Sequence, residues 1–248
     1  GAEPGAAAAD PVAKAAAPGA GAAPGAGAAA DEMHALMSLD PPPEVIVIHL
    51  ATHGQLVAQL QARYPQARVI GGRVMGQEVL IRRKGAASVG RGAGVLAITG
   101  NAPLFAMTCP YAGNVRRAEE TVKRKMRFAE EGAALHAQRI LGALLFTCNG
   151  RGRGMFGREA HDAQLFCAQF PAAPLLGHYA GGEIGPEVDE NEPDSLENTF
   201  SRGNAAMQGF TAVFGFFLVP NKSVPSSHFQ WAVLHGKVKE AFAELCNV

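Results

Sequence analysis

The sequence is poor in the residues that mark several classes of protein. Its 248 residues include four Cys and one Trp, and the formal net charge is zero because 22 basic residues balance 22 acidic ones. A chain without excess positive charge lacks the field on which nonspecific nucleic-acid binding depends. The longest mostly apolar run, residues 210–219, is about half as long as a membrane-spanning helix. We therefore expect an intracellular protein, cytoplasmic or nuclear, that binds neither nucleic acid nor membrane.

Metal-site spacing is also lacking. No two of the four cysteines have the short gap of a zinc knuckle, and so few in a chain of this size favour reduced thiols over a disulfide scaffold. His49 and His53 have the spacing of a zinc-protease helix, but they flank the end of a β-branched run. In a strand that spacing does not place two imidazoles on one helical face. We expect no metal and no cofactor.

The start of the chain lacks the residues that build a core. Only four of the first 30 residues are not Ala, Gly or Pro, and three prolines follow at 41–43. Such a segment cannot bury enough apolar surface to offset the entropy of ordering. We expect residues 1–43 to be a low-complexity, disordered lead-in, with order beginning at Glu44.

Residues 44–112 carry the pattern of an α/β module. The β-branched run Val45–Ile48 predicts a buried strand, and apolar residues at helical spacing over 56–64 predict a helix. Residues 68–72 predict the second, parallel strand of a βαβ unit. Further strands of the same sheet are predicted at 78–82, 94–99 and 103–107.

The same unit recurs in residues 113–220. A strand at 144–147, a Gly-rich loop, a helix at 159–170 and a strand at Leu175–Leu176 repeat the order of the first copy. YPQARVIGGRVMG (64–76) aligns without a gap with FPAAPLLGHYAGG (170–182), so that Gly71 stands opposite Gly177. We therefore predict an α/β fold of two similar βαβ-containing modules with mixed sheets.

Four other segments complete the expected fold. Asn114 is expected to cap a helix whose inward stripe is Val115, Ala118, Val122, Met126 and Ala129. An acidic excursion is expected at 187–205. Residues 210–219, apolar on both alternating faces, predict a central strand covered on both sides. An amphipathic helix is expected within 221–248.

The loop CNGRGRGMFGR, 148–158, is the best candidate for a binding site. It leaves the carboxyl end of a predicted strand and enters a predicted helix, where ligands bind in open α/β sheets. Its glycines allow close backbone approach, and its arginines and the helix N-terminus attract anions. A plain glycine-rich turn with solvated arginines is the alternative interpretation. The candidate ligand-binding residues of this loop are Cys148, Gly150, Arg151, Gly152 and Arg153.

Two other chemistries are weaker. Gly152-x-Gly154-x-x-Gly157 matches the dinucleotide fingerprint, but Gly177-His178 stands where an acidic residue should hold the ribose. A cysteine-dependent enzyme would use Cys148 with His161 or His178 as base, but no motif supplies an oxyanion hole. We expect no catalytic residues.

The second candidate region is the turn that follows the predicted strand at Leu175–Leu176. His178, Gly182 and Glu183 stand there, and parallel topology places the turn beside the 148–158 loop. Glu183 is expected to pair with Arg151 or Arg153, or to receive a ligand amine while the arginines take its carboxylate. A solvated residue at the start of a strand is the alternative.

These motifs resemble a known family. The Cys-x-Gly-Arg-Gly loop, the helix after it and the Gly-Glu-Ile turn, all within 141–186, resemble the C-terminal region of FIST domains. Residues 44–72 and 93–110 resemble the FIST N-terminal region, and 210–219 is similar to the family's closing strand. The segment 110–140 is shorter than the family pattern, and the 187–205 excursion is extra.

The resemblance implies a sensory or recognition module rather than an enzyme. It implies the substrate-recognition part of an F-box-like adaptor, whose partners are a substrate protein and, through an upstream F-box, a Skp1–cullin ubiquitin ligase. The alternative that it implies is a signalling domain that binds a small anionic ligand such as an amino acid.

Overall fold

The computed structural model describes residues 36–50, 55–74, 79–83, 86–90, 93–99, 103–188, 195 and 204–221. Most of the expected acidic excursion and the closing helix expected within 221–248 lie outside the described residues, as do residues 1–35 of the lead-in.

Two β-sheets form the centre of the molecule. The first sheet has the order β10-β9-β2-β1-β5 and the second the order β6-β11-β7-β8. Strands of the first sheet are β1 (Pro43–Leu50), β2 (Arg68–Arg73), β5 (Ala93–Thr99), β9 (Glu183–Pro186) and β10 (Ala205–Gln208). Strands of the second sheet are β6 (Leu104–Cys109), β7 (Gln138–Cys148), β8 (Leu175–Ala180) and β11 (Ala212–Pro220).

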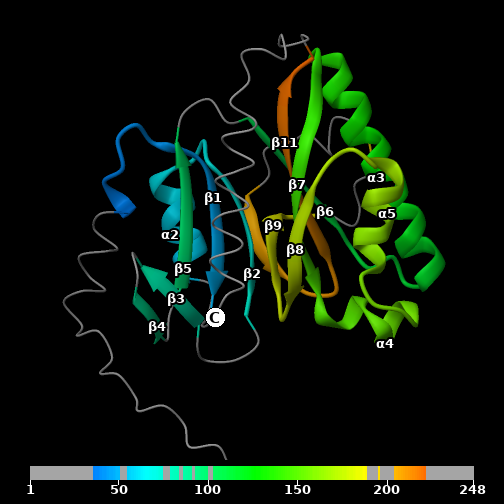
Figure 1. Ribbon diagram of the computed structural model, residues 1–248, viewed down its shortest axis with the longest axis horizontal. Coiled ribbons are helices and arrows are strands. Elements are labelled where there is room, and N and C mark those ends of the chain that lie inside the picture. Colours follow the sequence, from blue (N-terminus) through cyan, green and yellow to red (C-terminus); the bar gives the residue numbers. More distant parts are fainter. Residues whose placement is uncertain are drawn as a thin grey trace, which may run out of the picture.

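The helices cover the outer faces of the two sheets. Helix α2 (Gln55–Arg63) packs on the first sheet, and α3 (Val115–Leu135) and α5 (His161–Gln169) pack on the second. Figure 1 shows α2 on the left, the strands in the middle and α3 and α5 on the right. The fold is therefore a four-layered α/β/β/α sandwich, which confirms the predicted α/β class with mixed sheets.

Apolar side chains from both sheets fill the space between them. Val47 and Ile70 from the first sheet meet Phe146 and Val213 from the second in one buried cluster. Gly215 of β11 makes room there, because a Cβ atom at this position would overlap the Ile70 side chain. The two sheets thus share one close-packed interior.

The two βαβ units are built alike. Strands β1 and β2 are parallel with Ile48 opposite Gly71, and strands β7 and β8 are parallel with Leu145 opposite Gly177. In each unit a Cβ atom on the glycine would overlap the carbonyl oxygen of the residue opposite. The glycines aligned in the sequence repeat therefore occupy the same structural position and serve the same close approach.

The sheets do not coincide with the two stretches of sequence that hold the units. Strand β6 pairs with β11 in the second sheet, whereas β9 and β10 extend the first sheet beyond β2. Strand β3 (Val79–Arg83) pairs with β4 (Ala86–Gly90) in a separate two-stranded sheet. The prediction that 78–82, 94–99 and 103–107 all join the sheet of the first βαβ unit is therefore confirmed for 94–99, since β5 pairs antiparallel with β1, and is wrong for the other two. Strand signals in a sequence do not encode the pairing partner.

Helix α3 begins where predicted. The Asn114 side chain accepts a hydrogen bond from the Arg117 N–H at 2.9 Å. Ala118, Val122, Met126 and Ala129 are buried as expected. Val115 is 42% exposed, so its place in the inward stripe is wrong.

Order begins earlier than Glu44. The Tyr64 hydroxyl donates to the carbonyl of Leu36 at 2.7 Å and accepts from the Leu39 N–H at 3.1 Å. Leu36, Met37 and Leu39 also pack against the core between α2 and the first sheet. The predicted boundary at 43/44 is wrong by eight residues, because Leu36, Met37 and Leu39 supply apolar side chains that the Ala/Gly/Pro composition before them obscured.

Candidate functional site

Arg151 turns inward from the loop that links β7 to α5. The loop is made of a short 3₁₀ turn (Asn149–Arg151) and the one-turn helix α4 (Arg153–Phe156). The Arg151 side chain is 0% exposed and forms two hydrogen bonds with Asp162, from Nε at 2.9 Å and from Nη2 at 2.8 Å. This parallel, two-pronged contact is the strong geometry for a guanidinium and a carboxylate. The alternative interpretation, a solvated arginine, is therefore wrong for Arg151. Its ligand-binding role stays a prediction.

Neighbouring groups complete the coordination of this ion pair. The Thr147 hydroxyl donates to Asp162 at 2.7 Å, and Arg151 Nη1 donates to the carbonyl of Phe210 at 3.3 Å. The Phe156 ring lies 5.4 Å from the guanidinium carbon. Burial disfavours the charged guanidinium, but the hydrogen bonds and charge of Asp162 outweigh it and raise the pKa of Arg151. The Arg151 guanidinium therefore stays charged.

Glu183 is the second buried charge at this end of the sheets. It follows the Gly181–Gly182 turn, through which the chain leaves β8 in the second sheet and enters β9 in the first. Its Oε2 accepts hydrogen bonds from the main-chain N–H of Thr211 at 3.1 Å and from the Thr211 hydroxyl at 2.8 Å. Its Oε1 is buried and has no hydrogen-bond partner within the described part of the chain. We call Thr147, Arg151, Asp162, Glu183 and Thr211 the buried ionic centre.

The protonation of Glu183 follows from its surroundings. Its side chain is fully buried, and this loss of hydration raises the pKa of the carboxyl group. Hydrogen bonds from Thr211, a weaker interaction with the Gly182 main chain and the nearby charge of Arg151 act in the opposite direction but do not cancel the effect. Glu183 is therefore an acid that the fold holds closer to its neutral form than an exposed glutamate.

The expected pairing of Glu183 is wrong. Arg151 makes its ion pair with Asp162 rather than with Glu183, and Arg153 is 80% exposed with Glu159 at 3.7 Å. Arg151 still acts on Glu183 through its charge. The turn and the loop do lie together, as parallel topology predicted, but a third element, residues 209–211 between β10 and β11, stands between them.

The other predicted site residues line this junction. The Cys148 N–H donates to the carbonyl of Thr211 at 3.0 Å, and its side chain is half-buried. A Cβ atom on Gly150 would touch the Phe210 ring, and one on Gly152 would touch Glu159 and Tyr179. Gly182 has a φ of 147°, which favours glycine, and it bonds to Arg73 of β2. The glycines serve internal packing here rather than an exposed ligand.

The two histidines considered as bases have other surroundings. His178 packs edge-on against Phe146, with ring centroids 5.3 Å apart. The His161 ring is buried at the start of α5, 3.4 Å from Glu119 and against Phe156. Burial, together with the charge of Arg158, lowers the pKa of His161. These positions give the cysteine-enzyme hypothesis no added support.

Phe210 is an unusual residue at the surface of the centre. Its backbone has φ of 57°, a left-handed conformation that is rare for a bulky residue, and its ring is 60% exposed. The ring lies against Gly150 and 6.4 Å from the ring of Tyr111. Its carbonyl and the next residue, Thr211, bind Arg151 and Glu183. The short loop 209–211 thus carries an exposed aromatic ring and contacts both Arg151 and Glu183.

Sequence reasoning missed Asp162, Thr147, Phe210 and Thr211. Asp162 stands in the first turn of a helix, where an acidic residue is ordinary because it favours the helix dipole. Phe210 and Thr211 stand 59 and more positions from Arg151, and nothing local signals the contact. The one available signal was the Arg-Gly-Arg-Gly run, 151–154, ahead of a helix with an acidic first turn, and this combination is common to many unrelated sequences.

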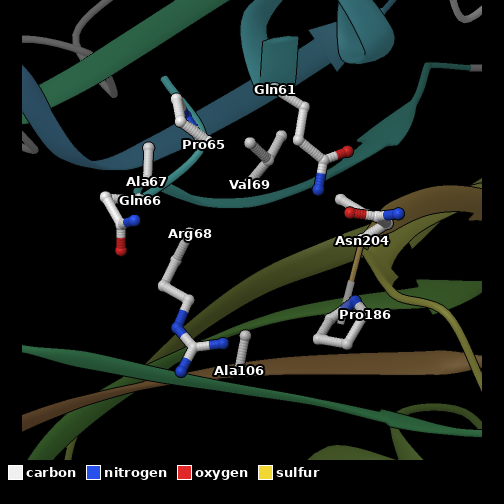
Figure 2. A pocket seen from close by; sticks show the side chains of 10 residues that line it. Gln61, Pro65, Gln66, Ala67, Arg68, Val69, Ala106, Pro186 and Asn204 are labelled. Carbon is white, nitrogen blue, oxygen red and sulfur yellow. The ribbon is translucent and has the colours of Figure 1, made fainter. Parts of the chain in front are cut away.

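A small cavity lies away from this centre. It has a volume of about 30 Å³ and is lined by Gln61, Arg68, Pro186 and Asn204 among others, near the beginning of β2. Figure 2 shows Arg68 extending across it toward Ala106. A space of this size holds a water molecule or two but no metabolite. It is not a ligand pocket of the predicted kind.

Across the described ranges, no three His, Cys, Asp or Glu side chains are grouped to hold a metal ion. Nor does any helix in those ranges combine the length and hydropathy that crossing a bilayer demands.

Comparisons with known proteins find one family and several relatives. The model of the FIST C domain matches residues 41–186. An uncharacterized protein of Mycobacterium bovis is 40% identical over 104 residues, which make up 42% of this chain and 23% of the relative. An uncharacterized protein of Mycobacterium tuberculosis is 40% identical over 96 residues, 38% of this chain and 21% of the relative. The chain therefore spans less than a quarter of the length of these relatives.

Proposed function

The chain belongs to the FIST C domain family, and on that premise we propose that it senses a small polar ligand at the buried ionic centre. FIST domains are generally sensory rather than catalytic. The matched residues 41–186 include the 148–160 loop and Glu183. The proposal therefore places recognition where the family match, the carboxyl ends of the parallel strands and the buried charges coincide.

One observation carries the proposal: Glu183 is fully buried and its Oε1 has no hydrogen-bond partner in the described region. Leaving such an oxygen unpaired costs about 1–3 kcal/mol, and native structures seldom retain that cost without a reason. A ligand that donates a hydrogen bond to Oε1 removes this free-energy cost. The centre thus favours a ligand with an amine or amide donor.

The surface around the centre favours a ligand that is also anionic. Arg153 and Arg158 are exposed on the loop above the buried pair, whereas Arg151 is neutralised by Asp162. The ligand would place an amine at Glu183 and a carboxylate at the surface arginines. A zwitterion such as an amino acid carries both groups. Entry requires residues 209–211 to move, because Phe210 and Thr211 bind the two buried charges. That movement is the signal that the module passes on.

A thermal-shift screen of the amino acids tests this function. Ligand that binds only the folded protein raises the melting temperature. We expect at least one amino acid to raise it in the wild type and in Glu120→Gln, which makes the same chemical change on an exposed face of α3. Glu183→Gln retains an acceptor for Thr211 and should fold, but it should lose the shift. A shift that survives in Glu183→Gln, or no shift with any amino acid, contradicts the proposal.

The ubiquitin-ligase adaptor stays a separate prediction of the family resemblance. It requires an F-box outside these 248 residues and a substrate protein, whereas the relatives above are mycobacterial. Affinity capture of the full-length gene product from its own cells checks it. Skp1 and cullin in the captured material would support the adaptor, and their absence would leave the sensory function as the better account.

A further inference from the structure

The four edges of the two large sheets are not equally protected. Strand β6 is completely buried, β10 has four residues, and β5 has the β3–β4 hairpin against it. Strand β8, the yellow-green strand beside β7 in Figure 1, is the remaining edge among the described strands. Leu176 of β8 is 52% exposed, and Gly177 is exposed too.

Strand β8 lacks the features that keep edge strands from pairing. Natural edges are blunted by charged side chains, proline or β-bulges. The six residues LLGHYA contain no charged residue and no proline, and their pairing with β7 runs without a register shift. An uncharged, regular and exposed edge is a ready template for another strand.

The first unit shows which kind of strand fits this position. Strand β2 is the counterpart of β8, and its outer edge carries β9 in antiparallel pairing at Gly71 and Gly72. The residues of β8 that match these glycines in the repeat are Gly177 and His178. Among the described strands, the second sheet thus has an open edge where the first sheet has an antiparallel neighbour.

The outward main-chain groups of β8 are placed to form hydrogen bonds with those of a second β8. The Ala143 N–H donates to the Pro174 carbonyl at 2.9 Å, which places the groups of Pro174 toward β7. Because a strand alternates every second residue, the main-chain groups of Leu175, Gly177 and Tyr179 point away from β7. These three residues are symmetric about Gly177. A twofold axis there pairs Gly177 with itself and Leu175 with Tyr179 of the other copy.

We propose that β8 is the interface of a homodimer, in which a second copy of this chain adds its own β8 in antiparallel orientation about Gly177. The pairing joins two four-stranded sheets into one continuous sheet. It places each exposed Leu176 opposite His178 of the other copy, where the apolar side chain is removed from water. No like charges meet, because the strand carries none. This inference does not depend on the proposed ligand.

The test combines the oligomeric state with a matched pair of variants of the full chain. Light scattering after size exclusion should find a dimer that dissociates on dilution. Leu176→Lys should raise the dimer dissociation constant about tenfold, from two lost cross-strand contacts and the two added charges. Leu96→Lys changes a leucine of similar exposure, 58%, on the β5 edge and should leave the constant unchanged. Circular dichroism confirms that both variants fold.

Hydrogen exchange gives a second, independent measurement. With rising protein concentration, the amides of Leu175, Gly177 and Tyr179 should become protected, while those of Leu176 and His178 already bond to β7 and should not change. A monomer at the highest soluble concentration overturns the proposal. So does a dimer that both lysine variants weaken equally, or one that leaves the exchange of β8 unaltered.

Discussion

The two βαβ units have the same parallel strand register but differ in the side chains that the connection and the helix bury. In the first unit residues 51–54 join β1 to α2, and the helix buries Val57 and Leu60 on the sheet. In the second unit the longer connection 149–160 carries Arg151, and α5 buries the Asp162 carboxylate in its first turn. The comparison shows that two units with the same strand register surround different helices, and that the second unit holds a buried charge pair between its connection and its helix.

The buried charge pair should give the largest difference between the units. Asp162→Ala removes one partner and leaves the Arg151 guanidinium charged in an apolar interior, which should cost about 3–5 kcal/mol of unfolding free energy. Denaturant unfolding monitored by circular dichroism measures it. Glu120→Ala, which breaks the exposed pair with Arg116, should cost less than about 0.5 kcal/mol.

A double variant separates charge from packing. Arg151→Met with Asp162→Leu replaces the pair by apolar side chains and should recover most of the loss seen in Asp162→Ala. If the double variant is as unstable as the single one, the pair is important for the loop's shape rather than for charge compensation.

The paired glycines test the similarity of the units instead of their difference. Gly71→Ala and Gly177→Ala each place a Cβ atom against the carbonyl oxygen of the neighbouring parallel strand, and each should cost about 1–3 kcal/mol. Gly154→Ala, where a Cβ atom meets nothing within 4 Å, should change stability by less than about 0.5 kcal/mol. Urea midpoints of the three variants compare them. A large cost at one paired position and none at the other would mean that the units are less alike than their register indicates.

The smallest effect on stability is expected from the titration of Glu183, at the point where the chain passes from the second sheet to the first. The folded protein raises the pKa of Glu183, so the protonated form stabilises the fold. That contribution is complete below the pKa of an unfolded glutamate, about 4.3, and is lost as the pH rises through the higher folded value. Relative to wild type, Glu183→Gln should therefore gain stability as the pH rises from 4 to 8, in melting curves recorded across this range. A difference that stays constant with pH would mean that Glu183 does not titrate between the two states.

Much of the fold was predictable because its signals are local. The β-branched run at Val45–Ile48, the apolar run that forms β11 and the stripe of α3 each report the face that a segment buries. The repeat was visible because both copies need glycine where two parallel strands approach closely. The 148–158 loop and Glu183 lie at the same end of the sheets, as parallel topology predicted, and both contact residues 210–211. Their role in ligand binding stays a prediction.

The chemistry of that site was not predictable from the same signals. An arginine in a glycine-rich loop is indistinguishable, in sequence, from a solvated one, and its burial depends on Asp162 and on a carbonyl 59 positions away. The sheet to which a strand belongs was not predictable either. The sequences of β6, β9 and β10 are compatible with a strand in either sheet.

The amino-acid sequence by itself determined the secondary structure, the α/β class and the internal repeat, since periodicity and glycine placement act within a few residues. Only the tertiary structure decided that Arg151 pairs with Asp162 and that Glu183, where the chain enters the first sheet, is buried with one oxygen that has no partner among the described residues. The tertiary structure also decided that β8 is an open edge among the described strands. These outcomes depend on which distant segments remove one another from water, and that choice minimises the free energy of the whole chain rather than of any segment.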